Sequence, residues 1–374
     1  MQQAANIYRL GIKELRSLWR DPMMLVLIVY AFTLGIYVAA SALPESLHKA
    51  PIAIVDEDQS PLSGRIAAAF FPPQFTRPSI VGLDEFDKGM DAGRYTFALD
   101  IPPDFQRDVL AGRQPTVQLN IDATRMSQAF SGGGYVQQIV QGEVSEFMKG
   151  TRATAPLPAE LALRARFNPT LAQSWFGSVM EIINNVTMLS IVLTGAALIR
   201  EREHGTIEHL LVMPVTPFEI MASKVWAMGL VVLVACAFAL IVVIQGVLKV
   251  PIEGSVSLFL LGASLHLFAT TSMGIFMGTV ARSMPQFGML LMLVLVPLQM
   301  LSGGTTPRES MPEMVQTLML AAPTTHFVKM AQAILYRGAG IDVVWPQFLA
   351  IIAIGSIFFV IALARFRKTI GTMA

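Results

Sequence analysis

A group of charged side chains lies in residues 199–224, directly after an apolar run. Residues 200–203 (RERE) alternate in charge, and Gly205 then interrupts the helical pattern. Thr216 and Pro217 begin a second helix with the spacing of a capping box. Two short helices joined in this way could form a stiff lever that transmits force. A solvated loop with ordinary helix caps is the structural alternative.

Other polar groups give no catalytic or metal-ligand pattern. Asp56, Glu57 and Asp58 could hold a cation, or they end a strand and cap the next helix. The glycine run 131–134 (SGGG) lacks the Lys-Ser/Thr of a phosphate-binding loop, so we expect a flexible hinge. A single cysteine, Cys236, permits neither an internal disulfide nor a cysteine metal cluster. The sequence has no Walker pattern, so an ATP-powered role requires a second polypeptide.

Four polar residues interrupt apolar runs and are candidates for a translocation path: Glu181, Asn184, Asn185 and His266. Polar side chains are costly at membrane depth, so each is a functional candidate. Hydrogen bonding between helices is the alternative for the first three. For His266 the alternatives are a packed interior histidine and a proton relay.

The composition of the chain is typical of a membrane protein. Of 374 residues, 53% are hydrophobic and 14% are charged, against about 25% charged in soluble proteins. An apolar solvent accounts for this difference. The formal net charge is +1, and no basic run is present, so we expect no nucleic-acid partner.

Six apolar stretches approach the roughly 20 residues that a membrane span requires. They are residues 23–42, 179–199, 225–247, 258–280, 287–301 and 348–364. The first could instead be a secretory signal, because Ala40-Ser41-Ala42 resembles a cleavage site. Its length and the five further stretches favour an uncleaved span.

Lysine and arginine residues near the span ends predict the orientation. They flank the first span on its N-terminal side, occupy 200–224 and position 282, and recur in the tail 365–374. Both termini and 200–224 are therefore predicted to be cytoplasmic. Residues 43–178 are predicted to lie outside, as is the loop 302–347, with short helices that enter the membrane without crossing it.

The N-terminal segment, residues 1–22, has the pattern of an interfacial helix. Arg9, Lys13, Arg16 and Arg20 fall within an arc of about 60° on a helical projection, with apolar side chains opposite. We expect this helix to lie on the inner leaflet. A helix packed on a soluble partner would show a similar pattern.

Residues 43–178 regain charges, prolines and glycines. Strand-like runs occur at 51–56, 95–101 and 116–122, and helix-like runs at 61–70, 103–111 and 127–149. The predicted fold is an α-helical polytopic membrane protein with six transmembrane helices, both ends inside, and an inserted α/β extracytoplasmic domain.

The segment after the second span resembles the signature of the ABC-2 type transporter permeases. The matching residues are Glu203, Gly205, Thr206, Glu208, Leu210, Leu211 and Pro214. Residues 52–60, 101–113, 302–307 and 323–326 also resemble parts of the drug- and export-type members. The resemblance covers almost the whole chain and is closest to permeases of Gram-negative inner membranes.

This resemblance implies an exporter subunit for a hydrophobic or amphipathic substrate. It implies a second permease half, identical or related, and an ATP-binding subunit or fused ATPase-permease that holds ATP and Mg, with no cofactor on this chain. Some relatives also use a periplasmic adaptor and an outer-membrane channel. The implied ATPase-coupling residues are Glu201, Glu203, Gly205, Thr206, Glu208 and Pro214.

Three other functional classes fit less well. An ion-coupled secondary transporter would require several ionisable residues at the membrane midplane and usually internal repeats. A membrane-anchored sensor or assembly protein would not need the charged segment 199–224. An enzyme would require a nucleophile–base or metal-ligand group that the sequence does not show.

Overall fold

The computed structural model describes residues 2–41, 47, 49–122, 126–149, 173–203, 214–304, 306 and 308–371. The chain forms two compact units, one comprising Met1–Leu43 with Ala165–Ala374 and the other Pro44–Arg164.

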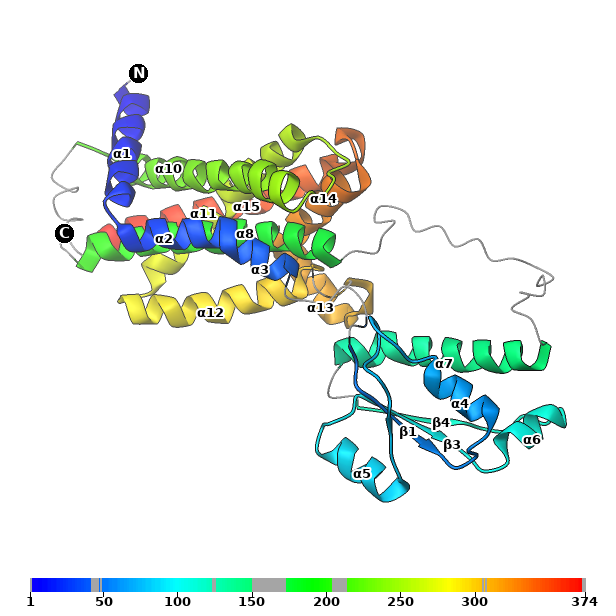
Figure 1. The fold of residues 1–374 in the computed structure, drawn as a ribbon. Coiled ribbons are helices and arrows are strands. Elements are labelled where there is room, and N and C mark those ends of the chain that lie inside the picture. Colours follow the sequence, from blue (N-terminus) through cyan, green and yellow to red (C-terminus); the bar gives the residue numbers. More distant parts are fainter. Residues whose placement is uncertain are drawn as a thin grey trace. The chain divides into compact units, whose positions relative to one another are not determined.

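The first unit is a bundle of helices (Figure 1). Its long helices are α1 (Gln2–Trp19), α2 (Pro22–Tyr30) with α3 (Ile36–Ser41), α8 (Gln173–Glu203), α10 (Pro217–Phe238), α11 (Val256–Val280), α12 (Met284–Leu301) and α15 (Ile341–Gly371). Six helical stretches in the described residues are long and apolar enough to cross a membrane: Pro22–Ser41, Trp175–Glu203, Pro217–Val247, Val256–Val280, Met284–Leu301 and Ile341–Lys368. The predicted number of spanning helices is confirmed, whereas their orientation stays a prediction.

Three helices begin or end further into the polar flanks than the hydropathy pattern predicted. Helix α8 continues through Glu203, because its last charged residues find partners on neighbouring helices. Helix α10 begins at Pro217 and runs without a break into the third span. The expectation of a separate short helix before residue 225 is therefore wrong. Helix α15 begins at Ile341 and includes Pro346 near its start, where proline is tolerated.

Two π-helical segments interrupt the spans, at Ala31–Gly35 between α2 and α3 and at Ala239–Val247 after α10. Such segments displace backbone carbonyls from regular helical bonding. The turn before α2 matches the sequence pattern: the Asp21 side chain accepts a hydrogen bond from the Met24 N–H, and Pro22 is the first helical residue.

Helices α8 and α11 pack backbone against backbone at the centre of the bundle. A Cβ atom on Gly274 would lie 2.6 Å from the Ile191 carbonyl oxygen. One on Gly278 would lie 3.2 Å from the Gly195 carbonyl oxygen. Small residues at the contact permit this close approach, which is a main source of helix association in a membrane.

Two shorter helices, α13 (Glu313–Leu318) and α14 (Pro323–Arg337), connect α12 to α15. Single 3-10 turns, Arg308–Ser310 and Met319–Ala321, precede and follow α13. The two short helices that the sequence predicted between the fifth and sixth spans are thus present, and their depth in a membrane stays a prediction.

The second unit contains a four-stranded sheet in the order β2-β1-β3-β4. The strands are β1 (Ile52–Asp56), β2 (Ser79–Ile80), β3 (Phe97–Ile101) and β4 (Gln118–Ile121). Strand β1 is parallel to β2 and β3, and β4 is antiparallel to β3. The helices are α4 (Pro61–Ala68), α5 (Leu83–Asp91), α6 (Phe105–Leu110) and α7 (Met126–Lys149). Helices α4 and α7 cover one face of the sheet and α5 the other (Figure 1).

The acidic turn after β1 has a structural role. Asp56 accepts hydrogen bonds from the Gln59 N–H and the Ser63 hydroxyl, both at 2.8 Å. Asp58 accepts one from the Gln106 N–H at the start of α6, at 3.0 Å. These bonds fit the helix-capping interpretation.

The glycine run does not form a hinge, so that expectation is wrong. Gly132, Gly133 and Gly134 lie within the continuous helix α7. A Cβ on Gly132 would lie 2.1 Å from the Phe97 ring, so the absence of a side chain lets α7 approach β3 closely.

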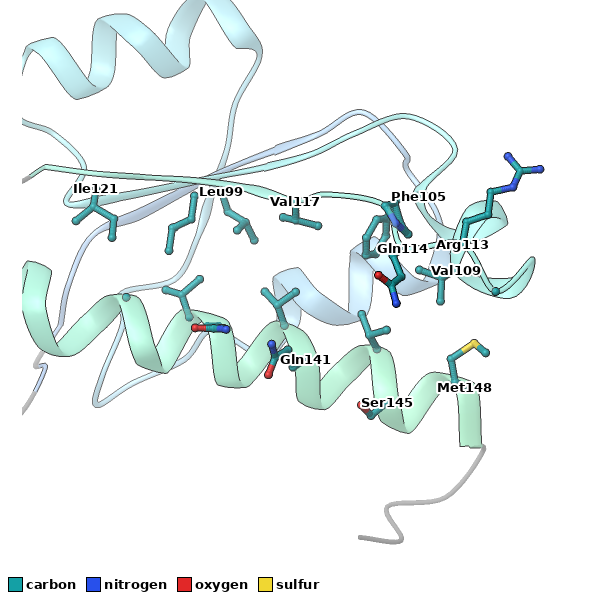
Figure 2. A pocket seen from close by; sticks show the side chains of 18 residues that line it. Leu99, Phe105, Val109, Arg113, Gln114, Val117, Ile121, Gln141, Ser145 and Met148 are labelled. Carbon is teal, nitrogen blue, oxygen red and sulfur yellow. The ribbon is translucent and has the colours of Figure 1, made fainter. Parts of the chain in front are cut away.

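A cavity of about 1000 Å³ lies between α7 and the β3–β4 side of the sheet (Figure 2). Valine, leucine and isoleucine side chains from both layers point into it, with amides such as Gln114 at its edge (Figure 2). The Arg113 side chain extends away from this space (Figure 2) and pairs with Asp108 at 3.0 Å. The lining of the cavity is therefore mainly apolar, with polar side chains such as Gln137, Gln141 and Ser145 contributing the rest.

Candidate functional site at the end of helix α8

The last four residues of α8, Arg200 to Glu203, each contact a different part of the bundle; we call them the charged end of α8. Arg200 pairs with Asp21 at the turn between α1 and α2. Arg202 donates to the Ala281 carbonyl oxygen at the end of α11, at 2.7 Å. Glu203 accepts from the Met284 N–H at the start of α12, at 3.0 Å. The charged end of α8 therefore ties the second span to the first, fourth and fifth.

The remaining residue of the charged end, Glu201, belongs to a group of two acids and two bases, the ion cluster: Lys13, Glu14, Glu201 and Lys224. Lys13 is partly exposed, whereas the other three side chains are largely buried. The Lys224 ammonium lies 2.7 Å from one Glu201 oxygen and 3.0 Å from a Glu14 oxygen. Lys13 lies 2.8 Å from the other Glu201 oxygen. The Lys224 side chain is 1% exposed. Burying a charge is tolerable only with such compensation, so the cluster fixes α1, α8 and α10 together.

Packing next to the cluster brings α1 against the start of α10. A Cβ on Gly11 would lie 2.1 Å from the Trp226 ring, so only glycine permits this approach. The Trp226 indole N–H donates to the Ile7 carbonyl at 3.2 Å, and its ring stacks parallel to Tyr8. Asn6 donates to Glu219 at 3.1 Å. Helix α1 runs across the direction of the spans (Figure 1).

The capping box that the sequence predicted at the start of α10 is confirmed. The Thr216 hydroxyl accepts from the Glu219 N–H at 3.3 Å, and Glu219 accepts from the Thr216 N–H at 2.6 Å. Because Glu219 also accepts from Asn6, the cap connects α10 to α1.

A shallow apolar hollow of about 250 Å³ adjoins this contact, lined by Ala4, Ile7, Tyr8 and Trp226. Tyr8 is 62% exposed, so the hollow is open on its outer side. An apolar side chain of another polypeptide could insert here.

The predicted coupling residues do not all share one environment. Glu201 pairs with Lys13 and Lys224 of this chain, which compensate its charge, and its role in contacting an ATPase stays a prediction. Glu203 is exposed and binds the start of α12, and Pro214 is exposed. Gly205, Thr206 and Glu208 lie outside the described residues.

The predicted inner-leaflet residues also divide into two groups. Arg9, Arg16 and Arg20 are exposed, as the interfacial helix requires. Lys13 instead turns toward Glu201. The seam of α1 that is buried in the bundle contains Gly11, Glu14 and Leu18, so an acid lies on the face that packs inward.

The polar residues of the spans lie in two environments. Asn185 is 4% exposed and donates to the Ala31 carbonyl, at the first π-helical segment, at 2.7 Å. His266 is fully buried, bonds to the Thr187 hydroxyl at 2.9 Å and stacks on Phe327. The structure thus favours the hydrogen-bonding and packing alternatives for these two. Glu181 and Asn184 are half-buried, and a role in translocation stays a prediction for them.

Sequence reasoning missed Glu14 and Lys224 as members of the site. Glu14 carried a signal, because it lies in line with Ile7, Gly11 and Leu18 at helical spacing. Lys224 was taken as a marker of the cytoplasmic end of a span. Nothing in the sequence alone pairs residues that are 210 positions apart.

The arrangement is suited to mechanical transmission. The segment between Glu203 and Pro214 is anchored at its first end by the charged end of α8 and at its second by the α10 cap. Short, charge-assisted contacts therefore connect the ends of that segment, and α1, to the spans. No group of three or more His, Cys, Asp or Glu side chains suited to a metal ion occurs in the described part of the chain.

Comparison with known proteins identifies the family of the chain. A family model described as "ABC-2 family transporter protein" matches residues 22–364. The inner membrane transport permease YhhJ of Escherichia coli K12 is 65% identical over 374 residues, which cover 100% of both chains. The probable multidrug ABC transporter permease YbhR of the same strain is 27% identical, over 98% of this chain and 99% of that one. The probable multidrug ABC transporter permease YbhS is 25% identical over 89% of each.

Proposed function

The chain belongs to the ABC-2 family of transporter proteins. On that premise we propose that it is a membrane-spanning subunit of an exporter that is driven by ATP hydrolysis on a partner subunit. It is a multi-pass protein of the inner membrane. The observation that carries the proposal is the charged end of α8, where four consecutive residues hold five other helical segments.

In this proposal the ATP-binding subunit contacts the exposed side of α1 and residues 204–214. Closure of two such subunits around ATP would displace these elements. The ion cluster would then force α8 and α10 to move with α1, because separating them exposes unpaired charges in an apolar surrounding. Alternating access follows if the two conformations of the bundle differ in the position of these helices.

The second permease half is proposed to cover apolar surface on the spans. Helix α12 leaves Met289, Met292 and Leu293 about two-thirds exposed, and most of its length is unburied in the single chain. Lipid or a second permease half could cover such a face. The substrate is proposed to be hydrophobic or amphipathic, in line with the multidrug names of the more distant relatives. A periplasmic adaptor remains a further proposed partner for the second unit.

Charge reversal at Glu208 tests the proposed coupling segment. We expect Glu208→Lys to reduce co-purification of an ATP-binding subunit with the tagged chain by about tenfold or more, because like charges across an interface cost several kcal/mol. The yields of both polypeptides from mild detergent give the measurement.

The matched control is Glu253→Lys, which reverses an exposed charge on the loop before α11. It should leave co-purification unchanged. The thermal unfolding midpoint of both variants must equal that of the wild type for the comparison to hold. An unchanged yield with a folded Glu208→Lys chain would exclude residues 204–214 as the coupling segment.

A further inference from the structure

A second cavity in the helical unit, of about 340 Å³, differs in chemistry from the sites above. It lies between the residues that follow α12 and one face of α14. Thr325, Val328, Lys329 and Gln332 line it from successive turns of that face. Neither the charged end of α8 nor the ion cluster contributes to it.

Cationic side chains outnumber acids around this cavity. Arg308, Lys329 and Arg337 line it, against the single carboxylate of Glu309. The cavity is therefore electropositive.

Two hydrogen-bonding groups in the cavity wall are buried without a partner among the described residues. The Thr325 hydroxyl belongs to a residue that is 3% exposed, and the Arg308 Nε is likewise buried and unpaired. Another Arg308 nitrogen, Nη2, donates to the Gln316 carbonyl at 3.1 Å, so the side chain is held in place. Leaving a buried donor unsatisfied is costly. A ligand with acceptor atoms would remove that cost.

Apolar surface adjoins the electropositive wall. Phe176 and Val328 line the same cavity, and Phe176 is 37% exposed. A fully hydrated ion makes no use of this surface, whereas a molecule with an anionic head and an apolar body matches both parts.

We propose that this cavity binds the phosphate or carboxylate head of an anionic amphiphile, with Arg308, Lys329 and Arg337 as the charged contacts and Thr325 as a hydroxyl donor. Arg308 is suited to a two-pronged contact with such a head, because its guanidinium presents several donors in one plane. The site is independent of the ATP-binding subunit, so it stands even if the proposed coupling is wrong.

The test uses the full-length chain in detergent micelles, titrated with phosphatidylglycerol or with phosphatidylcholine of the same acyl chains. Native mass spectrometry counts the bound lipid. We expect phosphatidylglycerol to bind about tenfold more tightly than phosphatidylcholine, and the double variant Lys329→Gln/Arg337→Gln to lose this preference. Both side chains are exposed, so their replacement spares the packed core.

Lys249→Gln provides the matched control, since Lys249 is an exposed lysine that does not line the cavity. It should keep the full preference. Competition by inorganic phosphate distinguishes a lipid headgroup from a free anion as the bound group. Displacement of bound lipid at millimolar phosphate would show that the free anion also occupies the site. Equal binding of both lipids, or the same loss of preference in Lys249→Gln, would overturn the proposal.

Discussion

Replacing Lys224 by methionine is expected to reduce the stability of the helical unit by about 3–5 kcal/mol. Methionine keeps most of the length of the side chain but removes the charge that lies between Glu14 and Glu201. Two carboxylates then remain buried with Lys13 as their remaining partner within the cluster. The midpoint of thermal unfolding of the purified chain in detergent measures the effect, and export should fall with it because α1 loses its tie to α8 and α10.

A double variant separates loss of charge balance from loss of packing. In Lys224→Met/Glu14→Gln the cluster keeps one acid, Glu201, and one base, Lys13, which are 2.8 Å apart. The double variant should therefore be less destabilised than the sum of the two single variants, by more than about 0.5 kcal/mol. Additive effects would show that the four residues do not act as one electrostatic unit.

Replacing Gly274 by leucine should move helix α11 away from helix α8. The Cβ atom alone would lie 2.6 Å from the Ile191 carbonyl oxygen and 3.0 Å from the Ile191 Cα, both backbone atoms that cannot rotate away. The helices must move apart, and the packing along the rest of the α8–α11 contact is lost. A cost of at least about 3 kcal/mol is expected from overpacking at a rigid contact. Folded yield from the membrane and the thermal midpoint report it.

Gly288→Leu is the matched control for this change. Gly288 also lies within a spanning helix, α12, yet a Cβ there has no atom within 4 Å. Leucine is the better helix former, so this variant should fold at least as well as the wild type. If Gly274→Leu were tolerated equally, the proposed close contact of α8 with α11 would be incorrect.

The sequence predicted the features that rest on local patterns. Apolar runs of sufficient length predicted the six spanning helices, and Thr216 with Pro217 marked a helix start that the structure confirms. Strands β1, β3 and β4 followed from their β-branched and alternating residues. Strand β2 has two residues, Ser79 and Ile80, and is too short to give a pattern.

Features that depend on tertiary contact could not be predicted in this way. The 131–134 glycine run suggested a hinge. In the structure the run lies inside helix α7, where Gly132 packs against the Phe97 ring. Glu201 has the sequence context of a surface acid, and its burial depends on Lys13 and Lys224, which come from distant parts of the chain. A short stretch of sequence does not show which distant residue will pair with a given charge.

The proposed function requires that a subunit that hydrolyses ATP binds this chain. The tagged wild-type protein, isolated in mild detergent, should carry an ATP-binding polypeptide in about equal amount, and the isolated material should hydrolyse ATP. The Lys224→Met chain, compared at equal amounts of folded protein, should export less substrate for each ATP that is hydrolysed. A folded wild-type chain that purifies alone and exports its substrate under an ion gradient, without ATP, would contradict the account.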